Sequence, residues 1–130
     1  MTSSDALIHA FDRIRDIVHR AVDGLSAEEM AFRIDGEANS IAWPVWHLTR
    51  IQDNHIADVS DLEQVWASSD WATRFDLPFD TRATGFGHSF DQVAAVQVDS
   101  GELLTGYHDE LYEQTIEFTS RLTETDLDRI

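Results

Sequence analysis

The sequence has no cysteine among its 130 residues. Disulfide bonds, thiolate metal ligands and a cysteine nucleophile are therefore excluded, because each of them needs a thiol side chain.

Positive charge is also scarce. Nine basic side chains stand against 25 acidic ones, which gives a formal net charge of −16. Such a chain repels a nucleic-acid backbone and an anionic membrane surface, so we expect neither as a partner. We read the acidic excess as solvated helix faces rather than as an acidic functional patch.

The sequence lacks a long apolar run, and its first residues lack the basic and apolar regions of a signal peptide. We therefore expect a cytoplasmic protein. Its length suits one domain, residues 1–130, and a hydrophobic fraction of 42% with four Trp and seven Phe supplies core material.

The most informative stretch is residues 39–55, which read NSIAWPVWHLTRIQDNH. Asn39 or Ser40 can cap a helix, and Pro44 is tolerated in its first turn, so we predict a helix that runs to about Val59. An inward-facing stripe is predicted from helical spacing. Its members are Trp43, His47, Ile51, Asn54 and Asp58.

The other long helices follow from apolar residues at spacings of three and four. One is predicted from Ser3 or Ser4 to about Leu25, followed by a short turn with a Ser26–Glu29 capping box. Another is predicted from Ser89 to about Leu122, with His108 on its inward stripe. A final helix cap is predicted at Thr125.

Three weaker signals complete the pattern. Residues 60–89 show no regular period, and a connection of this length usually has a function or a short helix of its own. We expect its aromatic side chains to fold it back over the bundle. The segment GFGH (85–88) predicts a turn, since it lacks the Lys-Ser/Thr ending of a phosphate loop. Gly101 and Gly106 each lower helix propensity by roughly 1 kcal/mol, which predicts a kink or a close helix approach.

Several of these segments resemble one protein family. Residues 39–43, 46–50, 52–53 and 55 resemble the second-helix signature of the DinB-like superfamily. GFGH (85–88), LLTGYH (103–108) and LTETDLDR (122–129) look like the same branch. That branch is related to the N-terminal domains of mycothiol-dependent maleylpyruvate isomerases of actinobacteria.

The resemblance implies an all-α, up-down four-helix bundle, often a homodimer, in which three His hold a divalent metal such as Zn, Ni or Fe. One ligand comes from the second helix, where His47 matches it, and two come from the fourth helix. Those two have no counterpart here, because the family's fourth helix would begin at about Ile130. The fourth helix therefore looks missing or truncated in this chain.

Other residues can be weighed as partners of His47. His55 cannot share its metal, because eight helical residues separate the two by about 12 Å along the axis. His108, Asp58 and Glu110 are candidate ligands from this chain. Equally, His47 can be a hydrogen-bonded core imidazole, and His108 can be a histidine at the bundle seam.

Trp43 and Arg50 are further candidates to line the site. Trp43 can wall a pocket or simply pack in the core. Arg50 can bind an anionic carboxylate or a thiol cofactor such as mycothiol, or form a salt bridge.

Three functions fit these observations. The first is a divalent-metal-dependent transferase or isomerase that uses a low-molecular-weight thiol of the mycothiol type. The second is a non-catalytic bundle that binds a small molecule or a partner. The third is a structural dimer in a stress response. Metal binding separates the first from the others, and an apolar pocket favours the second.

Overall fold

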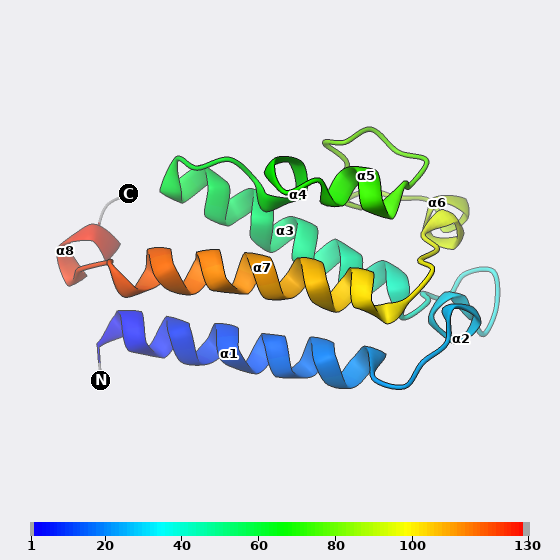
Figure 1. Cartoon of the computed structure of the whole chain (residues 1–130), viewed down its shortest axis with the longest axis horizontal. Helices are drawn as coiled ribbons and strands as arrows, with labels where there is room; N and C mark the ends of the chain where they lie inside the picture. Colours follow the sequence, from blue (N-terminus) through cyan, green and yellow to red (C-terminus); the bar gives the residue numbers. More distant parts are fainter. Residues whose placement is uncertain (1, 129–130) are drawn as a thin grey trace.

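A computed structural model describes residues 2–128 and shows that they form helices joined by turns and loops (Figure 1). Three helices are long: α1 (Ser3–Val22), α3 (Ala42–Ser60) and α7 (Gly101–Ser120). The other helices are short: α2 (Ala27–Ala31), α4 (Val65–Ser68), α5 (Trp71–Phe75), α6 (Phe90–Ala95) and α8 (Glu124–Leu127). The predicted all-α class is confirmed.

Helix α7 lies between α1 and α3 and packs against both (Figure 1). Helices α4 and α5 cover the other side of α3 and α7, while α2 and α6 lie at the end of the bundle where α3 begins. The three long helices thus form a row with α7 in the middle. On the side where α1 and α3 face each other, the described residues contain no further long helix.

The two predicted N-terminal starts lie close to the observed ones. Helix α1 is capped by Thr2, whose side chain accepts from the Asp5 amide, so the cap lies one to two residues before the predicted serines. The Ser26–Glu29 capping box is confirmed at the start of α2. Both boxes pair a hydroxyl with an acidic side chain three residues later, which satisfies two backbone amides at once.

Helix α3 occupies the predicted span but turns a different face inward. It starts at Ala42, and the Ser40 hydroxyl accepts from the Trp43 amide at 3.0 Å. The predicted inward stripe is wrong at Asn54 and Asp58, which are exposed, and the rest of that stripe is only half-buried. The buried face consists of Ala42, Val45, Trp46, Thr49, Arg50, Asp53, Ile56 and Ala57.

The reason for this correction is chemical. The buried face of α3 contains Arg50 and Asp53, both 0% exposed. Periodicity assigns charged residues to the solvent, but a charged group can be buried when hydrogen bonds satisfy it. These two residues are satisfied by backbone and side-chain groups from distant segments, which the sequence pattern does not reveal.

The helix predicted from Ser89 to Leu122 is in fact two helices, α6 and α7. Between them, Val96 and Val98 are buried, at 1% and 4% exposure, while Gln97 and Asp99 are exposed. This alternation is the period of an extended chain, not of a helix. The connection places both valines in the core and lets α7 start afresh at Gly101.

The irregular segment after α3 supplies much of the core, as expected. Trp66, Trp71 and Phe75 of α4 and α5 are all buried and pack around Tyr107 of α7. A Cβ atom at Gly106 would lie 2.8 Å from Trp71, so this glycine provides the predicted close approach.

Helix α8 begins two residues earlier than predicted. Thr123, not Thr125, is its cap and forms a capping box with Asp126. No helix within residues 2–128 combines the length and the apolar character needed to cross a membrane.

Candidate functional site

An apolar groove of about 540 Å³ runs between α1 and α3. A second hollow of about 530 Å³ continues it toward α8, and both are lined by Phe11 and Ile56. The first part is lined by Phe11, Ile14, His47, Leu48, Ile51, Gln52, His55 and Ile56. His47 therefore lies at the wall of an apolar groove that the central helix shares with α1.

The imidazole of His47 is held on two sides. Its Nδ1 lies 2.5 Å from the backbone carbonyl oxygen of Thr84, which can only accept, so Nδ1 carries the proton. The Trp43 ring stacks on it with centroids 4.6 Å apart and an interplanar angle of 16°. Within residues 2–128 the other nitrogen, Nε2, has no hydrogen-bond partner, so its lone pair is available.

The loop that reaches His47 needs a glycine at position 85. Gly85 has φ +94°, and a Cβ atom there would lie 2.7 Å from His47 Nδ1 and 3.1 Å from Trp46. The amide of His88 donates to the Gly85 carbonyl at 3.1 Å, which confirms the predicted turn. Glycine is thus required both for the backbone conformation and for the close approach to His47.

His88, at the end of the same turn, contacts Trp43 from the other side. The Trp43 Nε1–H donates to His88 Nδ1 at 3.3 Å, and the His88 ring packs against Trp46 and Phe79. Burial and the nearby His47 lower the pKa of His88, which favours the neutral ring that this hydrogen bond requires. Sequence reasoning did not single out His88; its place beside two glycines was the signal available.

Arg50 hydrogen-bonds to the loop that contains Thr81 and Ala83, and it does not line the groove. Its guanidinium donates to the carbonyl oxygens of Ala83 and Thr81 and to the Gln64 side chain, at 3.0, 3.3 and 2.7 Å. It also lies 5.0 Å from the Trp66 ring and 3.9 Å from the Asp53 carboxylate. Because Ala83 directly precedes Thr84, Arg50 fixes the segment that holds His47.

Asp53 completes this buried network. Its carboxylate accepts from the amides of Val65 and Trp66 at 3.0 and 2.8 Å and from the Tyr107 hydroxyl at 2.6 Å. Burial, followed by the Asp53 charge, raises the pKa of Tyr107. One side chain of α3 thereby ties α4 and α7 together, which fixes the frame around the loop.

His108 lies in α7, is 0% exposed, and has no hydrogen-bond partner for either ring nitrogen within residues 2–128. Burial lowers its pKa to about 4 from an ordinary 6.5; nearby Asp109 opposes this shift, while His19 and Arg15 add to it. It does not line the groove beside His47. The burial of His108 and its position away from the groove support the alternative of a histidine at the bundle seam.

We expect His108 to make stability fall in acid. Its pKa is lower in the folded state, so the unfolded state binds more protons between pH 6.5 and about 4, and stability is lost as the pH falls through this window. The expected loss is up to about 3 kcal/mol. His108→Leu should flatten this dependence in urea unfolding at several pH values, and should raise stability at pH 7 by about 1 kcal/mol.

The control is His9→Leu, which removes an exposed histidine of α1. It should leave the pH dependence of the wild type in place. An unchanged acid limb in His108→Leu would show that other groups cause the loss.

The other candidate ligands do not gather around His47. No group of three or more His, Asp or Glu side chains able to hold a metal occurs within residues 2–128. Glu110 accepts from Trp71 Nε1 at 3.3 Å, while Asp58 lines a different cavity. His47 fits as one ligand, but the described residues do not supply a complete metal site.

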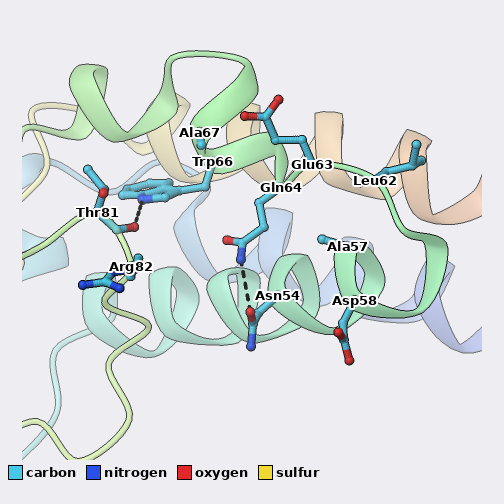
Figure 2. A pocket seen from close by; sticks show the side chains of 10 residues that line it. All are labelled: Asn54, Ala57, Asp58, Leu62, Glu63, Gln64, Trp66, Ala67, Thr81 and Arg82. Atoms are coloured by element: carbon cyan, nitrogen blue, oxygen red, sulfur yellow. Dashed lines mark hydrogen bonds between the residues drawn. The ribbon is translucent and has the colours of Figure 1, made fainter.

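That other cavity, of about 430 Å³, lies between α3, α4 and the loop containing Thr81 (Figure 2). Gln64 donates to Asn54 across it at 3.1 Å, and Trp66 donates to the Thr81 carbonyl. The carboxylates of Asp58 and Glu63 point in different directions rather than converge (Figure 2). This cavity is therefore a weaker candidate than the groove at His47.

Comparisons with known proteins agree with this architecture. A structure described as the conserved protein of locus from Enterococcus faecalis has a TM-score of 0.87 and 20% identity. The alignment covers 96% of this chain and 74% of that one, and at this identity it shows the fold alone. No curated protein matches the chain. The family model of the DinB superfamily matches residues 10–130, and this chain therefore belongs to the DinB superfamily.

Proposed function

We propose that this protein is a divalent-metal-dependent transferase or isomerase that uses a low-molecular-weight thiol of the mycothiol type, with His47 as one metal ligand. The observation that carries the proposal is the Nε2 of His47 beside the groove, which has no hydrogen-bond partner within residues 2–128, while Nδ1 donates to the Thr84 carbonyl. Histidine ligands in metal sites are oriented by such a hydrogen bond from the second ring nitrogen.

The chemistry of the proposal is consistent with the composition. A bound divalent ion, for instance Zn, Ni or Fe, acts as a Lewis acid that lowers the pKa of a thiol. The chain has no cysteine, so the thiol belongs to a cofactor. The remaining ligands would come from a second chain or from residues outside 2–128.

The apolar lining supports a place for the substrate in the same groove. Ile14, Leu48 and Ile51 flank His47, and Gln52 supplies a polar group among them. Mostly apolar pockets with a few polar groups are typical of small-molecule sites. The same observation supports a second candidate function, a non-catalytic bundle that binds a small apolar molecule in this groove.

Metal binding tests the proposal directly. We expect the purified wild-type protein to bind Zn²⁺ or Ni²⁺, measured by native mass spectrometry and calorimetry. His47→Ala should weaken binding by more than about 100-fold, because loss of an outer-shell partner alone costs 10- to 100-fold. The matched control is His55→Ala, two turns along the same helix face, which should bind as the wild type does.

Two outcomes would contradict the proposal. Equal metal affinity of wild type and His47→Ala would exclude His47 as a ligand. No metal binding, together with saturable binding of an apolar dye that Ile51→Glu abolishes, would leave the second candidate function.

A further inference from the structure

Residues 84–88 contact both His47 and the ring that covers it. The Thr84 carbonyl accepts from His47 Nδ1 at 2.5 Å, and His88 Nδ1 accepts from Trp43 Nε1 at 3.3 Å. Trp43 in turn stacks on His47. One short turn, 37 residues away from His47 in the sequence, thus reaches its imidazole by two routes.

The two routes fix different properties of the His47 ring. The Thr84 carbonyl decides which nitrogen carries the proton, because a carbonyl only accepts. The Trp43 stack decides the plane of the ring, since nearly parallel rings at 4.6 Å leave little room for rotation. Both are needed to hold the lone pair of Nε2 in one direction.

His88 is the anchor of the second route. Its ring packs against the rings of Trp46 and Phe79, whose centroids lie 5.8 and 4.6 Å away. This packing fixes the position of His88 Nδ1, which accepts from Trp43 Nε1. The indole of Trp43 has only one polar hydrogen, and this bond therefore selects one orientation of the indole.

We infer that His88 is a positioning residue for His47: the turn of residues 84–88 sets the tautomer and the plane of the His47 imidazole through the Thr84 carbonyl and through Trp43. Gly85 permits this arrangement, because any Cβ atom there would lie 2.7 Å from His47 Nδ1. The value of this positioning for function rests on the proposed role of His47, but the positioning itself can be measured without a metal.

The experiment reads the His47 ring directly by ¹⁵N NMR of the metal-free protein, at a pH above the ordinary histidine pKa. The wild type should show one tautomer, with Nδ1 protonated. His88→Leu should shift the Trp43 Nε1–H signal and change the ¹⁵N signals of the His47 ring, because the Trp43 stack no longer fixes the plane of that ring. His88→Asn should restore both, because the Asn side-chain oxygen can take the place of Nδ1.

Two further variants sharpen the result. Trp43→Phe keeps an aromatic ring but removes the Nε1–H donor, so it should change the His47 signals as His88→Leu does. The double variant should then add nothing beyond either single variant, because both break the same interaction. Gly85→Ala should disturb the His47 Nδ1 signal by the other route, and it keeps the test valid if His88→Leu does not fold.

The inference is overturned if His88→Leu displaces the Trp43 signal but leaves the His47 ring signals unchanged, or if His47 keeps its wild-type signals in Gly85→Ala. It is also overturned if His88→Asn behaves as His88→Leu, because His88 would then act only by filling space. A single tautomer that responds to these variants, in a protein without metal affinity, would support the positioning and contradict the proposed function.

Discussion

Replacement of Asp53 by Ala is expected to lower the free energy of unfolding by about 3–5 kcal/mol, because it breaks a buried charged network. The carboxylate accepts three hydrogen bonds, from the Val65 and Trp66 amides and from the Tyr107 hydroxyl. Without it, these three donors lose their buried acceptor, and the Arg50 guanidinium 3.9 Å away loses a buried opposite charge. Urea unfolding followed by circular dichroism measures the loss.

Asp58→Ala is the matched control, since it removes an exposed carboxylate from the same helix. It should change stability by no more than about 0.5 kcal/mol. If Asp53→Ala does not fold, Asp53→Asn keeps one acceptor oxygen and should cost about 2 kcal/mol. A cost for Asp53→Ala equal to that of Asp58→Ala would show that the network does not stabilise the fold.

Replacement of Trp66 by Ala is expected to cost about 3–5 kcal/mol, the range for large aromatic side chains removed from a core. Trp66 is 4% exposed and lies 5.0 Å from the Phe75 ring and 5.1 Å from the Tyr107 ring. Its Nε1–H also donates to the Thr81 carbonyl at 3.0 Å. Thermal and urea unfolding should both report the loss.

The same variant should loosen the loop that reaches His47. Thr81 is held by Trp66 and Arg50, and Thr84 follows three residues later. Amide hydrogen exchange of residues 81–88 should therefore become faster in Trp66→Ala. Phe86→Ala, which removes a side chain that is 88% exposed, is the control and should leave stability within about 0.5 kcal/mol. Equal effects of the two variants would contradict this role of Trp66.

The effect of these variants on the groove separates stability from function. His47 lines the groove, whereas Asp53 and Trp66 do not. If the proposed function is correct, His47→Ala removes metal affinity from a protein that remains folded. Trp66→Ala instead weakens metal binding only as far as it displaces the loop of residues 84–88.

The sequence by itself determined the helical class, the span of α3 and the Ser26–Glu29 capping box. These features depend on neighbours three or four residues apart, so local periodicity and local hydrogen bonds decide them. The absence of cysteine likewise excluded disulfide bonds, thiolate metal ligands and a cysteine nucleophile without any structure. His47, the candidate site residue of the central helix, lies beside a concavity in the structure.

Only the tertiary structure decided which face of α3 is buried and what holds His47. Arg50 and Asp53 are charged, and their burial depends on acceptors and donors 12 to 54 residues away in the sequence. The break between α6 and α7 was decided in the same way, by the burial of Val96 and Val98 in a core that other segments form. The tautomer of His47 depends on the Thr84 carbonyl, and no spacing within the central helix encodes a contact with a loop 37 residues away.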